Sequence, residues 1–346
     1  MSRCAIVLAA IFLLFGSQAG RPDTPIHLRV IGGLATAGQY QRLEKPFWDS
    51  VTALSDGRVT AEIFPSDRSG LAPNEILRLM RLGVVTFGTV LLLQVDHPEL
   101  SVIDLPALNP DIATLRRSVA AYRPHLEEVL RSKFGVKLLA IFTYPAQEIF
   151  CTKELGGLSD LAGRKVRTSS ADQSVLMSAV GARPLFLPYD DILPAVRSGV
   201  VDCAITGTMS GNEIGLSKVT GSLYPLPINW GVSLFAVNLA AWEDLPADIQ
   251  KILAEGITKL EQDIWAAAER DTVAGILCDV GRSSCPDGNG PGHMKLTEVT
   301  RADEARRGRL LIETVLPAWI RQCGAPCVKL WNETMAPVVG ISASEG

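Results

Sequence analysis

The sequence predicts an α/β protein of two domains. The first observation is segment 160–211, where short apolar runs alternate with helix-like stretches. Such alternation is typical of a parallel sheet with right-handed crossovers. The second is the length of 346 residues, too great for one ordinary hydrophobic core. With 47% hydrophobic and 20% charged residues, the composition is that of a globular chain.

Segment 160–211 can be divided into elements from its caps and apolar runs. Ser169 or Ser170 can cap a helix that Gly181 ends, and Asp190 can cap the next one. The expected order is a strand at 165–168, a helix at 171–180, a strand at 185–187, a helix ending before Gly199 and a strand at 200–205.

The elements before this segment follow from hydrophobic periodicity. One face of an expected helix carries Leu43, Phe47, Val51 and Leu54. By the same reasoning we expect strands at 26–31, 59–64, 87–93 and 136–142, and helices at 40–54, 75–82 and 113–133. The glycine-rich loop 32–40 can approach a ligand closely or can simply join a strand to a helix.

The later elements are fewer and longer. A loop region is expected after Gly211, then a strand at 230–237 that returns to the first domain, a helix from Pro246 to about Leu277, and a helix at 302–320. These crossings predict a first domain of 26–146 with 231–270, a second domain of 147–230 with 271–335, and a flexible tail at 336–346.

Arg167 is the leading candidate for a binding residue. It lies at the carboxyl end of the expected strand 165–168, and ligands of open α/β sheets bind at that edge. The helix start at Ser169 and Ser170 adds backbone amides that also favour an anion. A surface ion pair between Arg167 and Asp172 is the alternative interpretation.

Three motifs carry a resemblance to a known family. They are D-L-x-G-x-K-x-R at Asp160, Leu161, Gly163, Lys165 and Arg167; G-x-V-D at Gly199, Val201 and Asp202; and W-x-x-L-P at Trp242, Leu245 and Pro246. Together they resemble the DctP-type solute-binding proteins of TRAP transporters. The resemblance implies a periplasmic-binding-protein-like fold with the cleft at a hinge and a long helix that spans both domains.

The resemblance also implies roles for individual residues. The matching arginine binds the carboxylate of a small organic acid, so Arg167 is expected to do so. Further ligand-binding candidates are Ser169, Gln147, Thr206, Gly207 and Trp230. Gln147 stands where many members have a second arginine, and Thr206 where many have asparagine; Trp230 could equally be a core residue. Some relatives use a cation held by a glutamate, but Ile205 occupies that position here, so no metal is expected.

The cysteines predict disulfides in an oxidising compartment. Cys278 and Cys285 bracket a Gly/Ser-rich turn, and Cys323 and Cys327 form C-x-x-x-C, so two local bridges are expected. A zinc site is the competing interpretation. Cys151 and Cys203 are interpreted as small buried apolar residues.

The amino terminus predicts secretion. Residues 1–19 combine Arg3, an apolar run and a small-residue cleavage site, as in a signal peptide; an uncleaved anchor is the alternative. We therefore expect a periplasmic protein. A formal net charge of −4 means that the chain has no excess of basic residues for binding nucleic acid, so no such partner is expected.

No catalytic constellation is found, so the sequence does not predict an enzyme or a cofactor. The four histidines lie on unrelated segments, and G-x-S-x-G does not occur. Helix capping can explain the pair Asp190 and Asp191. The prediction is a monomeric binding protein that captures an organic acid and delivers it to a TRAP-type permease. A sensory module for a receptor kinase is the main alternative, and a secreted enzyme the third.

Overall fold

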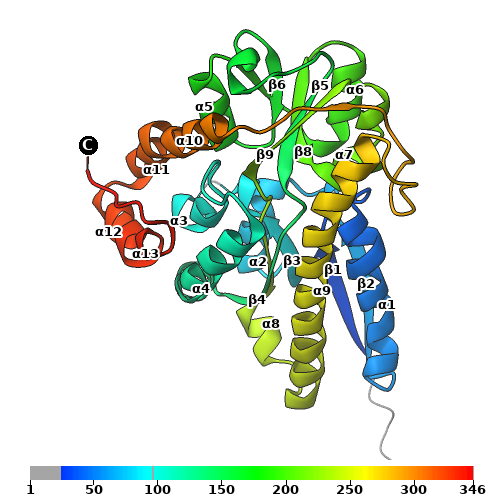
Figure 1. Cartoon of the computed structure of the whole chain (residues 1–346). Coiled ribbons are helices and arrows are strands. Elements are labelled where there is room, and N and C mark those ends of the chain that lie inside the picture. Colours follow the sequence, from blue (N-terminus) through cyan, green and yellow to red (C-terminus); the bar gives the residue numbers. More distant parts are fainter. Residues whose placement is uncertain (1–24, 96, 346) are drawn as a thin grey trace, which may run out of the picture.

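The computed structural model describes residues 25–95 and 97–345. The expected signal peptide therefore lies outside the described residues. Two sheets with flanking helices form two domains, one above the other in Figure 1. The predicted two-domain α/β fold is confirmed.

The first domain is built on a five-stranded sheet. Its order is β2-β1-β3-β10-β4, formed by β1 (Ile26–Gly32), β2 (Val59–Pro65), β3 (Phe87–Leu91), β4 (Val136–Phe142) and β10 (Ser233–Asn238). β1 is parallel to β2 and β3, whereas β10 is antiparallel to β3 and β4. Its helices are α1 (Lys45–Leu54), α2 (Ile76–Arg81), α3 (Pro98–Ser101), α4 (Ile112–Phe134) and α8 (Leu239–Glu243).

The second domain is built on a six-stranded sheet. Its order is β11-β9-β5-β8-β6-β7, formed by β5 (Gln147–Cys151), β6 (Lys165–Thr168), β7 (Arg183–Phe186), β8 (Cys203–Gly207), β9 (Ser222–Asn229) and β11 (Lys295–Leu296). β6 is parallel to β7 and β8, as the strand–helix alternation predicted. Its helices include α5 (Ala171–Ala179), α6 (Ile192–Arg197) and α7 (Thr208–Glu213).

Two crossings and one long helix join the domains. The chain passes from β4 to β5 and later returns from β9 to β10. α9 (Ala247–Asp279) contacts α1 and β4 in the first domain and α7 and β9 in the second (Figure 1). The expected long helix that spans both domains is therefore present.

The return crossing is fixed by a buried carboxylate. Asp104 Oδ1 accepts hydrogen bonds from the backbone N–H groups of Trp230 and Gly231, both at 3.1 Å, and Oδ2 accepts one from Val232 at 3.0 Å. Gly231 has φ +66°, a conformation that side-chain-bearing residues rarely adopt. The chain direction between the two domains thus depends on one side chain of the first domain.

Several expected elements differ from the structure. Residues after Gly211 were expected to be a loop region, but they contain β9, so that prediction was wrong. Pro225, Pro227 and Asn229, at alternate positions, hide this strand's pattern. Asp190 does not cap α6, whose N-cap residue Asp191 makes no side-chain capping bond. The helix expected at 302–320 runs without a break from Arg301 to Cys323, as α10 (Arg301–Leu310), a π-helical turn at Leu311–Val315 and α11 (Leu316–Cys323).

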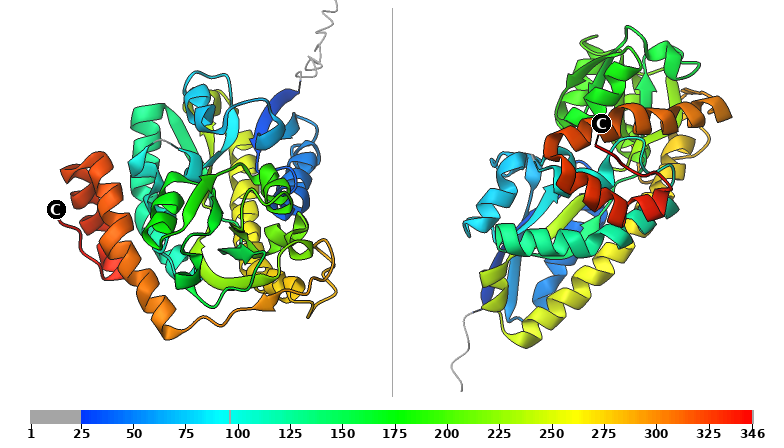
Figure 2. Two further views of the ribbon diagram at one scale, coloured as in Figure 1. Left: turned by 90° about the horizontal axis from the view of Figure 1, so that it is seen from above. Right: turned by 90° about the vertical axis from the view of Figure 1, so that its left-hand side faces the viewer.

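The carboxyl terminus packs against the first domain instead of forming a free tail. α12 (Ala325–Thr334) and α13 (Ala336–Val339) contact α4, as Figure 2 shows. Trp319 and Trp331 are fully buried here, and Trp331 Nε1 donates to the carbonyl oxygen of Ile341 at 2.7 Å. Trp319 Nε1 donates to the carbonyl oxygen of Pro98 at 2.9 Å.

The described part of the chain contains three disulfides. Cys278 is joined to Cys285, and Cys323 to Cys327, the two pairs expected from their spacing. The interpretation of Cys151 and Cys203 as two unpaired residues was wrong, because they form a third bridge. They lie directly opposite each other on the antiparallel strands β5 and β8, with 4.1 Å between their Cα atoms.

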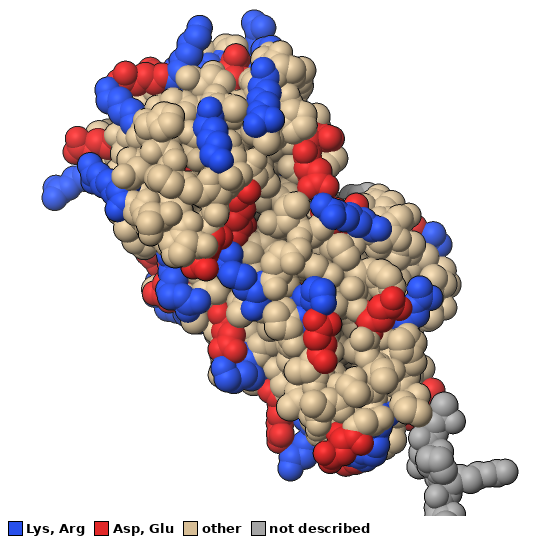
Figure 3. Space-filling model, turned by 90° about the vertical axis from the view of Figure 1, so that its right-hand side faces the viewer, with Lys and Arg blue, Asp and Glu red and all other residues tan. Residues whose placement is uncertain are grey.

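The surface carries charges of both signs. On the face in Figure 3, lysine and arginine side chains are interspersed with aspartate and glutamate. No helix in residues 25–95 and 97–345 has the length and apolar character needed to cross a membrane. Attraction for an anion must therefore come from a local arrangement of side chains.

Candidate ligand-binding cleft

A cavity of about 310 Å³ lies between the two domains. Its walls come from the carboxyl ends of β1, β2 and β3 in the first domain and of β6 and β8 in the second, the edge at which α/β sheets bind ligands. Residues on the wall include Leu34, Ala37, Ser66, Asp67, Leu71, Pro73, Leu91, Leu93, Tyr144, Gln147, Arg167, Ser169, Tyr189, Asp190, Thr206, Gly207, Ser210, Gly231 and Val232.

Arg167 is a buried cation without an anion. Its side chain lines the cavity and the residue is 4% exposed. Nε donates to the carbonyl oxygen of Leu187 at 2.9 Å, and Nη1 to that of Ile205 at 2.6 Å. Within the described part of the chain, no carboxylate lies within 4.0 Å of the guanidinium, so the alternative pair with Asp172 is not formed. Burial lowers the pKa of Arg167 to about 10, so the group stays charged near neutral pH.

Gln147 lines the same cavity as Arg167 and is held by a polar network. Its Oε1 accepts from Gln173 Nε2 at 3.2 Å and from Ser169 Oγ at 3.5 Å. Gln173 Oε1 in turn accepts from the backbone N–H of Ser169 at 2.8 Å. The oxygen end of Gln147 is thus occupied, and its Nε2 is left as the free donor of that side chain.

The other predicted site residues divide between wall and core. Thr206 and Gly207, at the end of β8, and Ser169, after β6, line the cavity. Trp230 does not. It is 4% exposed, and its Nε1 donates to the carbonyl oxygen of Asn109 at 3.0 Å inside the core. Its neighbour Gly231 is on the wall instead.

Two acidic residues on the wall were missed by the sequence analysis. Asp67 follows β2 in the first domain, and Asp190 lies on a turn of the second. Asp67 Oδ1 accepts from the backbone N–H of Ala35 at 2.9 Å. The pKa of Asp190 is raised by partial burial and then by the charge of Asp67. The two carboxyl groups therefore interact across the cleft, and only the fold brings them together.

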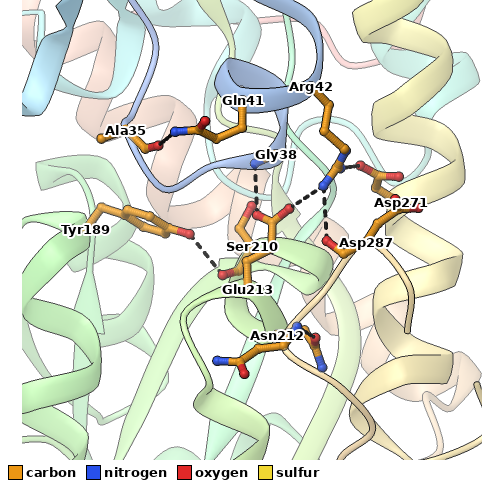
Figure 4. A network of polar contacts seen from close by, with 11 residues as sticks. Ala35, Gly38, Gln41, Arg42, Tyr189, Ser210, Asn212, Glu213, Asp271 and Asp287 are labelled. Atoms are coloured by element: carbon orange, nitrogen blue, oxygen red, sulfur yellow. Dashed lines mark hydrogen bonds and ion pairs between the residues drawn. The ribbon is translucent and has the colours of Figure 1, made fainter. Parts of the chain in front are cut away.

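A second cross-domain contact borders the cavity, shown in Figure 4. Arg42 Nη1 lies 2.9 Å from Glu213 Oε1 on α7, and Nη2 lies 2.7 Å from Asp271 Oδ2 on α9. Glu213 Oε2 also accepts from the backbone N–H of Gly38 at 3.1 Å. A Cβ at Gly38 would lie 2.2 Å from Arg42 Nη1, so a side chain at position 38 would displace the guanidinium. Burial raises the pKa of Glu213 to about 7, although Arg42 opposes the shift.

The arrangement suits binding rather than catalysis. In residues 25–95 and 97–345, no group of three or more His, Cys, Asp or Glu side chains is placed to hold a metal ion. What the cavity offers is one uncompensated cation, a free amide donor and largely apolar walls. These features can hold the carboxylate of a small molecule.

Comparison with known proteins agrees with this geometry. Residues 35–274 match the family model DctP, described as bacterial extracellular solute-binding protein, family 7. A solute-binding protein of Albidiferax ferrireducens is 23% identical over 253 residues, 70% of this chain and 73% of that one.

Two solved structures show the same fold. An extracytoplasmic solute receptor of Bordetella pertussis that binds pyroglutamic acid has a TM-score of 0.75 at 22% identity, over 90% of this chain and 99% of that one. A TRAP periplasmic solute-binding protein of Desulfovibrio salexigens with bound orotic acid has a TM-score of 0.76 at 20% identity, over 90% and 99%. Because the family model covers more than half of the sequence, the chain belongs to the DctP family of extracellular solute-binding proteins, which bind solutes and are not enzymes.

Proposed function

We propose that this protein captures a small organic acid in the periplasm and delivers it to a TRAP-type membrane permease. The observation that carries the proposal is Arg167, a buried guanidinium on the cavity wall with no carboxylate beside it. A buried charge is costly unless it is paired, so the site is complete only when an anion enters. Solved relatives that bind pyroglutamic and orotic acids support a carboxylate ligand.

Arg167 and Gln147 divide the recognition of the carboxylate. The guanidinium supplies planar, charge-assisted hydrogen bonds, with Nη2 not engaged by any described residue. The amide Nε2 of Gln147 supplies a neutral donor in place of a second arginine. Ser169 and Thr206 add hydroxyl groups on the same wall.

Binding is coupled to closure of the cleft. Since the wall comes from both domains, a ligand that contacts both favours the closed form over the open one. Two crossings and α9 form the hinge, and the permease recognises the closed shape.

The test begins with a thermal-shift screen of pyroglutamate, orotate, succinate and malate, because a ligand at about 100 times its Kd adds about 2.7 kcal/mol of stability. Calorimetry with the best acid then compares wild type with Arg167→Ala and Arg167→Lys. Losing one partner of a buried charge pair costs about 2–5 kcal/mol, so Arg167→Ala should weaken binding about 30-fold to several-thousand-fold. Arg167→Lys should restore only part of the affinity.

The matched control is Arg183→Ala, which removes an exposed arginine on the neighbouring strand β7 and should leave the Kd unchanged. A folded Arg167→Ala protein that binds the acid as tightly as wild type would contradict the proposal.

A further inference from the structure

The cavity continues into an apolar groove. A second hollow of about 600 Å³ shares Pro73, Leu93 and Pro188 with the cavity wall. The rest of its lining is Asn74, Val95, Ala171 and Phe186. Both domains contribute to the groove, as they do to the cavity. A ligand in the cavity can therefore extend into the groove without leaving the cleft.

Phe186 is unusually exposed for its size. Its side chain stands at the end of β7, on the groove, and the residue is 57% exposed. The cavity wall itself carries the apolar side chains of Leu34, Leu71, Leu91 and Val232. Apolar surface thus runs from the cavity to the outer end of the groove, where an apolar ligand group would cover Phe186.

The charges in the cavity favour one carboxylate and oppose a second. Arg167 is the one cation on the described wall of the cavity, and it lies on the cavity rather than on the groove. Asp67 and Asp190 are on the same wall and are both acidic. A second carboxylate on the ligand would therefore meet either like charge or apolar surface, and both are unfavourable.

We propose that the ligand is a monocarboxylate with an extended apolar body, and not a dicarboxylate or a sugar acid. Arg167 holds the carboxylate, and the apolar body follows the leucine-lined wall past Pro73, Leu93 and Pro188 to the face of Phe186. This inference rests on the proposed function, because it assigns a class of ligand to the same site.

Calorimetry with two matched series tests it. The first series is butanoate, hexanoate, octanoate and decanoate; the second is hexanedioate and octanedioate. Burying one methylene is worth about fourfold in affinity, so Kd should fall by about two- to fourfold per carbon in the first series. Each dicarboxylate should bind at least about tenfold more weakly than the monocarboxylate of equal length.

Two variants locate the effect. Phe186→Ala, at an exposed position that should not disturb folding, should weaken decanoate binding and leave butanoate binding unchanged. Asp67→Asn should reduce the difference in Kd between octanoate and octanedioate. Phe64, which is half-buried on β2 and does not line either hollow, gives the matched control Phe64→Leu, with no change in chain-length dependence expected.

The outcomes separate this inference from the proposed function. Three results would overturn the inference but still leave an organic acid as the ligand. They are tighter binding of the dicarboxylates than of the monocarboxylates, a Kd that does not depend on chain length, and binding of succinate when no monocarboxylate binds. Acid binding that is insensitive to Arg167→Ala would overturn the proposed function itself. Absence of binding by both series would count against the inference as well.

Discussion

Two buried carboxyl groups, Glu148 on β5 and Asp279 at the carboxyl end of α9, interact electrostatically, and we expect Glu148→Gln to stabilise the protein in a pH-dependent way. Glu148 is 2% exposed and Asp279 is fully buried. Among the described residues, neither Glu148 Oε2 nor Asp279 Oδ2 has a hydrogen-bond partner, and Asn212 Nδ2 donates to Asp279 Oδ1 at 3.0 Å. Burial raises the pKa of both groups, with the charge of Asp279 adding to the effect on Glu148.

The magnitude follows from the pKa of Glu148. Burial and then the charge of Asp279 raise this pKa above its ordinary value, and each pH unit of such a difference costs about 1.4 kcal/mol of stability. Because the folded-state pKa lies above the unfolded one, the penalty is absent below about pH 4 and grows as the pH rises. Glutamine at position 148 cannot ionise, so it avoids this penalty, and its amide can donate to Asp279.

Thermal unfolding followed by circular dichroism between pH 4 and pH 8 provides the measurement. Glu148→Gln should gain about 1–3 kcal/mol at pH 8, or roughly 1–5 °C in Tm, and nothing at pH 4. The control Glu255→Gln removes an exposed carboxylate of α9 and should show no such gain. Equal or lower stability of Glu148→Gln at pH 8 would refute the reasoning.

Two other predictions concern contacts between strands and between domains. Arg42→Gln removes the ion pair to Glu213 across the cleft, so stopped-flow measurement should show faster ligand release with little change in the association rate. The control Arg123→Gln breaks an ion pair within the first domain and should change neither rate. Replacing Cys151 and Cys203 together by alanine removes a bridge between residues 52 apart in sequence. This should lower the free energy of unfolding, measured by chemical denaturation, by about 2–5 kcal/mol. Unchanged stability would show that the bridge contributes nothing.

Local sequence signals predicted much of the second domain. Ser170 caps α5 by accepting from the backbone N–H of Gln173, and the parallel strands β6, β7 and β8 follow from the strand–helix alternation around them. These features depend on residues within one turn or one crossover of each other. The carboxyl end of β6 could therefore be located, and with it the position of Arg167 on the cavity wall.

The missed features all depend on partners that are distant in sequence. Cys151 and Cys203 become opposite neighbours only once the register of β5 and β8 is known. Asp67 and Asp190 come from different domains, and their interaction exists only across the cleft. The sequence assigned Trp230 equally to the cleft or the core. The structure places it in the core, where its Nε1 donates to the carbonyl oxygen of Asn109. No local sequence pattern encodes that contact.

The charge on Arg167 has a consequence for the pH range of binding. Its pKa of about 10 keeps the guanidinium protonated at any pH below about 9, while a simple carboxylic acid is ionised above about pH 5. Between these limits neither partner changes charge, so the contact itself gives a flat affinity across neutral pH. Glu213, with a pKa of about 7, and its contacts to Arg42 and Gly38 lie at the edge of the same cleft. Protonation of Glu213 weakens that cross-domain pair, so we expect Kd to rise between pH 8 and pH 6 and this rise to be absent in Glu213→Gln.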